Sequence, residues 1–171
     1  MADAAFEALV EEAAVQMAHG GAFLVTGDLA NPMTIGWCQW GRLWNRPVCT
    51  VFVRHSRYSH GLISSGRFTV SIPKAGTMQK ELAYCGTKSY RDGDKLAALG
   101  LTLVPSQTEG VPGIAGCAIH FECKVLMQQE ADYSTLAEPC RHQFYDPATQ
   151  AGDDGDPHTI YFAEILAAYR E

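Results

Sequence analysis

Ala22-Phe-Leu-Val-Thr26, Met33-Thr-Ile-Gly-Trp37 and Val48-Cys-Thr-Val-Phe-Val53 are three short runs rich in β-branched, aromatic and other apolar residues. Runs of this kind favour β-strands. Short segments containing Asp, Asn, Gly and Pro separate them, and these residues form tight turns. Because consecutive strands joined by short turns usually pair with one another, residues 22–53 predict three strands of an antiparallel meander.

The rest of the chain adds strands and short helices to this meander. One amphipathic helix is expected over residues 4–18, where apolar residues recur at helical spacing. Further elements are expected as strands at 67–72, 117–127 and 159–167, as short helices at 57–65, 77–83 and 94–99, and as a loop at 104–116 and an acidic turn at 148–157. Without βαβ alternation, this pattern predicts a mainly β protein with peripheral helices, arranged as a small antiparallel barrel. We expect one domain over residues 1–171, with an N-terminal helix in 1–20 and the barrel in 22–167.

The composition limits the partners that the protein is expected to have. A chain of 171 residues with a formal net charge of -6 does not suit nucleic acids or anionic membranes, so neither is expected as a partner. The sequence contains no run of about 20 apolar residues, the length that spans a membrane, and no basic leader segment. We therefore expect a cytoplasmic protein that holds any anionic ligand through a few specific cations.

The cysteines and histidines show no spacing typical of a metal site. The six cysteines form no C-x-x-C pair, and the histidines do not combine with them in a known zinc pattern. The sequence also lacks the P-loop, the G-x-S-x-G elbow and the G-x-G-x-x-G turn. The prediction is therefore no metal, and the hydrolase, NTPase and Rossmann classes lack support.

Arg54-His-Ser-Arg-Tyr58 is the densest polar segment, and it stands where a predicted strand ends and a predicted helix begins. The guanidinium groups of Arg54 and Arg57, together with the hydroxyls of Ser56 and Tyr58, suit the oxygens of a phosphomonoester. The residue types alone are equally compatible with surface arginines and a serine that caps the helix.

Asn31-Pro-Met-Thr-Ile-Gly-Trp37 offers a wall for a flat ligand. Gly36 lets a ligand approach the backbone, Thr34 supplies a hydroxyl, and Met33 or Trp37 supplies apolar cover. Taken alone, an edge strand with a packing glycine would have the same residues.

Residues 85–95 combine small residues, hydroxyls and cations in a loop between predicted helices. Lys88 and Arg91 in this loop are suited to closing over a phosphate. Cations in loops are also commonly solvated charges without a ligand.

Several of these motifs occur in a characteristic order. They are Asn31-x-Met-Thr-x-Gly-Trp37, Pro47, Arg54-x-Ser-Arg-Tyr58, Phe68-Thr-Val-Ser71, Cys85-Gly-x-Lys-Ser89, Arg91-Asp92, Asp94-Lys95, Cys123-Lys-Val125, His158-Thr159 and Glu164. The ordered series resembles the flavin reductase family in its flavoredoxin-like branch, over about residues 22–167.

This resemblance implies a homodimeric split β-barrel that binds FMN near the dimer interface. By position, residues 54–58 match the family's phosphate-binding segment, residues 31–38 match the segment along the flavin ring, and residues 88–89 match a loop that reaches the cofactor. The cofactor-binding residues implied in this way are Asn31, Met33, Thr34, Gly36, Trp37, Cys38, Arg54, Ser56, Arg57, Tyr58, Lys88 and Ser89.

The resemblance also implies an NAD(P)H-dependent oxidoreductase. Hydride would pass from NAD(P)H to N5 of FMN. The reduced FMN would then pass electrons to free flavin or to another acceptor, either a small molecule or a protein. His158 falls near a family segment on the nicotinamide side of the flavin and is the implied catalytic residue. Tyr90, Pro157 and Ala163 depart from the family pattern, and these departures concern the second-substrate pocket more than the flavin site.

Two other functions fit the same motifs. A non-catalytic FMN electron-transfer protein, reduced by a protein partner, would share the barrel. A sensing module would respond to oxidants through Cys38, a residue whose simpler role is that of a small buried packing group.

Overall fold

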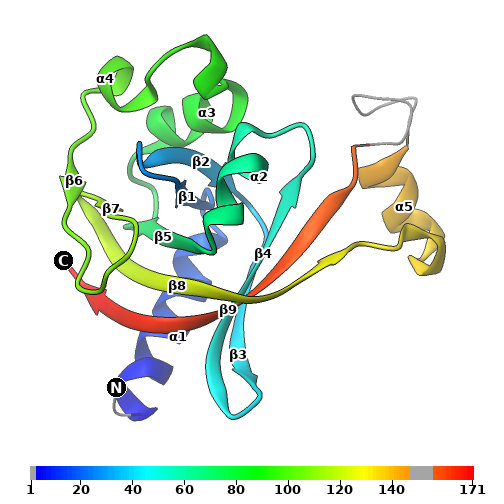
Figure 1. The fold of residues 1–171 in the computed structure, drawn as a ribbon, viewed down its shortest axis with the longest axis horizontal. Helices are drawn as coiled ribbons and strands as arrows, with labels where there is room; N and C mark the ends of the chain where they lie inside the picture. Colours follow the sequence, from blue (N-terminus) through cyan, green and yellow to red (C-terminus); the bar gives the residue numbers. More distant parts are fainter. Residues whose placement is uncertain (1–2, 147–155) are drawn as a thin grey trace.

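The computed structural model describes residues 3–146 and 156–171, and within these residues seven antiparallel strands form one sheet (Figure 1). The strands follow the order β2-β1-β5-β8-β9-β4-β3 across the sheet. Their bounds are β1 (Ala22–Thr26), β2 (Asn31–Ile35), β3 (Cys38–Leu43), β4 (Arg46–Arg54), β5 (Arg67–Pro73), β8 (Cys117–Glu130) and β9 (His158–Arg170). Two short strands, β6 (Leu103–Val104) and β7 (Gly113–Ile114), pair separately.

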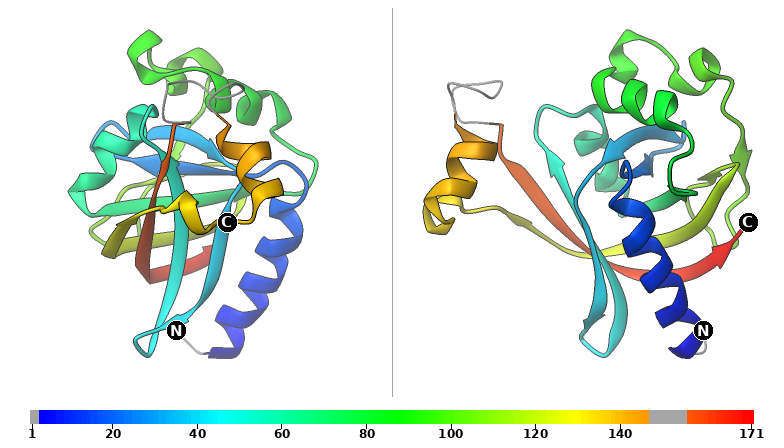
Figure 2. Two further views of the ribbon diagram at one scale, coloured as in Figure 1. Left: turned by 90° about the vertical axis from the view of Figure 1, so that its right-hand side faces the viewer. Right: turned by 180° about the vertical axis from the view of Figure 1, so that it is seen from behind.

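The two longest strands, β8 and β9, curve the sheet into a barrel-like shape (Figures 1 and 2). Their pairing shifts register between Glu122 and Cys123 and again between Val125 and Met127, and such irregularities bend a strand and increase its twist. The edge strands β2 and β3 are not hydrogen-bonded to each other within the described residues, so the barrel stays open. The predicted antiparallel split barrel is confirmed in this open form.

Helices cover the sheet from several sides. The helical segments are α1 (Asp3–Met17), α2 (Tyr58–Leu62), η1 (Ile63–Ser65), α3 (Gln79–Thr87), η2 (Tyr90–Asp92), α4 (Lys95–Leu99), η3 (Tyr133–Thr135) and α5 (Glu138–Tyr145). The apolar side chains of Phe6, Leu9 and Ala13 on α1 are buried and join the main core. The short α2 follows β4 directly, α3 contacts β2, and α5 stands at the far end of β8 (Figure 1). None of the described helices has the length and apolarity needed to cross a membrane.

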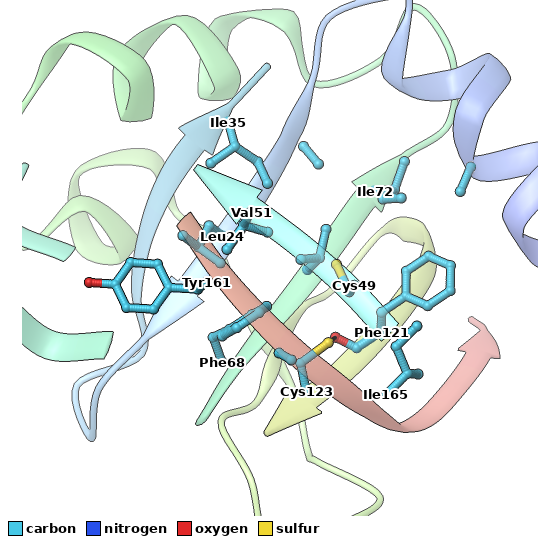
Figure 3. Close-up of a cluster of buried hydrophobic side chains, with 14 of the residues drawn as sticks. Leu24, Ile35, Cys49, Val51, Phe68, Ile72, Phe121, Cys123, Tyr161 and Ile165 are labelled. Carbon is cyan, nitrogen blue, oxygen red and sulfur yellow. Dashed lines mark hydrogen bonds between the residues drawn. The ribbon is translucent and has the colours of Figure 1, made fainter. Parts of the chain in front are cut away.

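The core lies inside the curved sheet, where one face of each strand is apolar (Figure 3). Leu24, Val51, Phe121 and Ile165 come from four different strands and are almost fully buried. Burial of the apolar side chains in this core favours folding by about 25 cal/mol per Å² of apolar surface removed from water. This core fixes the position of β2 relative to β4 and β9, the three strands that supply the site described below.

The sequence predicted most of the longer elements within a few residues of their observed ends, but it missed the strands β3, β6 and β7 and the helical segments η2, η3 and α5. The strand β7 lies inside the segment expected as a loop, 104–116. The strand β3 was not predicted because Gln39, Gly41 and Arg42 interrupt its apolar residues and it is mostly exposed, as an edge strand is. No element was predicted for the segment that contains α5, where Pro139 stands in the first turn, a position that a helix tolerates. Of the predicted acidic turn, residues 148–155 lie outside the described residues.

Candidate functional site

Two adjoining cavities lie where β2, the end of β4, α3 and the start of β9 meet. The larger, of about 410 Å³, is lined by Met33, Thr34, Ile35, Gly36, Trp37, Phe52, Arg54, Ser56, Arg57, Gly86, Asp156 and His158. The smaller, of about 80 Å³, is lined by Met33, Ser56, Arg57, Tyr58, Ser59, Thr87, Lys88, Ser89 and Lys95. The two cavities share three residues, so one extended ligand can occupy both.

Aromatic rings form one wall of the larger cavity. The Trp37 ring lies with its centroid 4.9 Å from that of His158 and meets the Phe52 ring edge-on at 6.2 Å. On the opposite side, the Thr34 hydroxyl donates a hydrogen bond to the Leu82 carbonyl of α3, at 2.6 Å. Thr34 therefore fixes β2 against α3, and its hydroxyl hydrogen is already used within the protein.

His158 is buried at the start of β9, opposite Arg54 in the strand pairing. Burial, followed by the nearby Arg54 charge, lowers the pKa of His158 to about 4, so its imidazole is neutral at neutral pH. The hydroxyls of Tyr145 and Tyr133 lie 3.1 and 3.4 Å from its Nδ1. If Nδ1 accepts from these hydroxyls, the single ring proton is on Nε2, and the ring offers a hydrogen-bond donor there.

The smaller cavity gathers cations around a space that holds several waters or one tetrahedral anion. Lys95 is only 3% exposed, and its Nζ donates to the Pro32 carbonyl at 2.6 Å. Arg57 is half-buried and donates to the Gly86 carbonyl and, at 3.3 Å, to the Met33 sulfur. Burial lowers the pKa of both side chains, as expected for positive charges removed from water.

Arg54 and Ser56 make contacts that differ from the predicted phosphate contacts. The Arg54 guanidinium donates to the carbonyls of Asp156 and Phe144, at 2.8 and 3.0 Å. The backbone N–H and the hydroxyl of Ser56 both donate to the Asp156 carboxylate, at 3.0 and 2.6 Å. Ser56 therefore does not cap α2, whose N-cap is Arg57. In this structure a carboxylate of the protein itself occupies the anion-binding position of Ser56.

The structure brings most of the predicted site residues together. Those that line one or both cavities are Met33, Thr34, Gly36, Trp37, Arg54, Ser56, Arg57, Tyr58, Lys88, Ser89 and His158. Asn31 and Cys38 line neither cavity. The Asn31 amide donates to the Ser59 hydroxyl at 2.8 Å, and the Cys38 sulfur lies 3.3 Å from that of Cys49.

The site prediction omitted Phe52, Asp156 and Lys95, which also line the cavities. Phe52 is half-buried in a strand that otherwise points to the core, and sequence periodicity did not separate it from core residues. Asp156 comes close to Ser56 only through the pairing of β4 with β9. Lys95 was part of the motif series, and its burial could have been suspected from its position after the helix-capping Asp94.

Comparison with known families decides the classification. The flavin reductase like domain model matches residues 15–171, which is most of the chain. The protein belongs to the flavin reductase-like family. The recognition of this family from the ordered motifs is therefore confirmed.

Individual proteins are also similar to this flavin reductase-like chain. An uncharacterized protein of Archaeoglobus fulgidus is 38% identical over 87 residues, which are 50% of this chain and 49% of the relative. The chain thus spans about half the length of that curated relative. Among solved structures, flavoredoxin from Methanosarcina acetivorans superposes with a TM-score of 0.65 at 24% identity, over 88% of this chain and 67% of that chain. The NADH:FAD oxidoreductase of Streptomyces globisporus C-1027 superposes with a TM-score of 0.61 at 20% identity, over 92% of this chain and 81% of that chain. These two similarities show a shared fold.

The chemistry of the smaller cavity fits a phosphate-bearing ligand. A buried ammonium such as that of Lys95 is costly unless an anion or several acceptors compensate it. Its bond to the Pro32 carbonyl uses one of three N–H groups. A phosphate group in this cavity would compensate the buried positive charges of both Lys95 and Arg57. FMN carries such a phosphate at its end.

Proposed function

We propose that this protein binds FMN across the two adjoining cavities and works as an NAD(P)H-dependent oxidoreductase. The observation that carries the proposal is the small cavity lined by the buried Lys95 and the half-buried Arg57, beside a larger one walled by Trp37 and Phe52. The phosphate would lie near Lys95, Arg57 and Lys88, and the ring system would lie in the larger cavity.

The bound FMN would supply the redox chemistry, accepting hydride from NAD(P)H and passing electrons to a second acceptor. The protein's own contribution is binding, orientation and exclusion of water. Trp37 and Phe52 cover the larger cavity with apolar surface, and Met33 closes it where it meets the smaller one. The neutral His158 at the cavity wall would orient a ligand through an Nε2–H donor without adding a charge.

We further propose that the protein acts as a homodimer in the cytoplasm. The support is the family resemblance, together with exposed apolar side chains at Leu126 on β8, Leu166 on β9 and Trp44 in the turn between β3 and β4. Exposed apolar groups of this size are typical of surfaces that other chains cover.

The direct test is an anaerobic visible spectrum of the purified protein with FMN, before and after NADH or NADPH is added. Bound FMN that is bleached promptly would support the oxidoreductase and identify the preferred donor. Bound FMN that neither nucleotide bleaches would favour an electron-transfer protein reduced by a protein partner. Failure to bind FMN would refute the proposal.

A further inference from the structure

Four polar side chains converge on one point outside both cavities. They are His55 in the turn after β4, His60 on α2, Glu130 at the end of β8 and Thr159 on β9. The Nε2 atoms of His55 and His60 lie 3.2 and 2.9 Å from the Thr159 hydroxyl oxygen. His55 Nε2 also lies 2.6 Å from Glu130 Oε2. Two histidines five positions apart and a glutamate 70 positions further along the chain thus place two imidazole nitrogens and one carboxylate around a common centre.

This cluster has the donor set of a transition-metal site. The candidate ligand atoms of His55, His60 and Glu130 all lie within 4.8 Å of one another. In a tetrahedral zinc site, bonds of 2.0–2.2 Å to His nitrogen and carboxylate oxygen place neighbouring ligand atoms about 3.3 Å apart. His55 Nε2 and Glu130 Oε2, now 2.6 Å apart in a direct contact, would have to separate to admit the ion, and the remaining ligand separations are below 4.8 Å, so side-chain rotations would form the site.

The backbone around the cluster holds the three side chains in place. The His55 N–H donates to the Pro157 carbonyl at 3.0 Å, which ties the turn after β4 to β9. Glu130 is paired with Thr159 in the β8–β9 ladder, and the Thr159 hydroxyl donates to Glu130 Oε1 at 2.7 Å. This bond orients the carboxylate and leaves Oε2 turned toward His55, as outer partners of metal ligands commonly do.

We propose that His55, His60 and Glu130 form a binding site for a zinc ion, with Glu130 coordinating through Oε2 and solvent completing the coordination. Imidazole and carboxylate together suit Zn²⁺, and three protein ligands with an open fourth position are a stable arrangement for it. The site is accessible, because the side chains of His55 and Glu130 are 40% and 62% exposed. It lies outside the two cavities, since none of the three ligands lines either of them.

The spacing of histidines and cysteines gave no hint of this site, because the three ligands come together only through tertiary structure. His55 lies in the turn after β4, His60 follows five residues later on α2, and Glu130 comes 70 residues after His60. The competing explanation is a hydrogen-bond network without metal, in which the Thr159 hydroxyl accepts from both rings and donates to Glu130.

Calorimetric titration of Zn²⁺ into the FMN-loaded protein, after removal of metal with a chelator, separates the two explanations. We expect the titration to give one zinc ion per chain. In a separate thermal unfolding experiment, a free zinc concentration about 100 times the dissociation constant should raise Tm by about 5 to 10 °C. His60→Ala and Glu130→Gln should each weaken zinc binding at least about 100-fold while leaving FMN binding unchanged. Two variants are used so that a folding defect in one does not decide the result.

Two histidines elsewhere serve as controls. His19→Ala removes an exposed histidine outside the cluster and should leave zinc binding unchanged. His142, which lies within 3.8 Å of Glu138 and 3.4 Å of Asp146 on α5, is the strongest competing ligand group. The proposal is overturned if no zinc binds, if binding survives in both His60→Ala and Glu130→Gln, or if His142→Ala is the variant that abolishes it.

Discussion

Replacing Lys95 with methionine tests whether the smaller cavity holds the phosphate of FMN. The side chain is 3% exposed, and its Nζ donates to the Pro32 carbonyl at 2.6 Å beside the half-buried Arg57. Methionine keeps a similar length and flexibility but removes the charge and the donors. The variant therefore changes electrostatics at the cavity while largely preserving its shape.

The size of the effect follows from the type of contact. A hydrogen bond to a charged group contributes about 1.5 to 3 kcal/mol, so Lys95→Met should weaken FMN binding by about 10- to 150-fold. Riboflavin lacks the phosphate and should bind both proteins equally. Titrations that follow the quenching of flavin fluorescence measure both ligands on the same scale. The matched control is Lys88→Met, which removes an exposed cation at the same cavity. This substitution should weaken the free energy of FMN binding by less than about 1 kcal/mol.

The stability of the flavin-free protein provides an independent check. Burial lowers the pKa of Lys95, which shows that the folded state disfavours its charge. Replacing a buried charge by an apolar group of similar shape is often close to neutral, so the variant should unfold at nearly the same urea concentration. Equal losses of FMN and riboflavin affinity, or no loss of either, would refute a phosphate at Lys95.

Three further outcomes test the acid behaviour and packing of the fold. Because burial lowers the pKa of His158 to about 4, the unfolded chain binds more protons between pH 4 and about 6.5, and stability should fall by about 2 kcal/mol from pH 7 to pH 5; urea unfolding of His158→Gln should lose that slope. Glu122→Gln should cost about 3 kcal/mol in the same assay, because the buried carboxylate accepts five hydrogen bonds from Ser106, Gln107, Thr108 and Tyr169, and an amide nitrogen would face some of those donors; a loss below about 1 kcal/mol would contradict this. Gly113→Ala should lower stability by about 1 to 3 kcal/mol, because a Cβ there would lie 2.4 Å from Nδ1 of the buried His120, and an unchanged Tm would show that this ring can move.

The sequence predicted what local patterns control. The strands at 22–26 and 67–73 and the α1 helix followed from periodicity, since a core-facing strand or helix carries its apolar pattern in its own residues. The segments proposed to face the flavin ring and the phosphate, residues 31–38 and 54–58, carry motifs that each lie within one turn and one strand. Edge strand β3 was not predicted, because its residues face solvent and bear little of the apolar pattern that marks a strand.

What sequence could not supply were contacts set by the pairing of distant strands. The bonds between Asp156 and Ser56 join residues 100 positions apart, and they gave Ser56 a partner different from the phosphate expected for it. The buried state of Lys95 depends on the packing of α4 against β2, which the predicted helix over residues 94–99 did not by itself reveal. A local motif identifies residues whose side chains are able to bind a ligand. Tertiary contacts determine which of these side chains already bond to another part of the protein.

The pairing of β4 with β9 explains how one short segment can serve two sites. Arg54 pairs with His158, and both line the larger cavity. Side chains alternate between the two faces of a strand, so Thr159, the next residue of β9, lies on the other face from His158; it contacts His55 in the turn directly after β4, and both belong to the cluster outside the cavities. A shift of this pairing by one residue would exchange the two sets and destroy both sites at once. The bonds of Arg54 and His55 to the backbone of residues 156–157 hold that register at the strand end. The cavity proposed for the flavin and the proposed zinc site therefore depend on the same few backbone contacts, although they share no ligand residue.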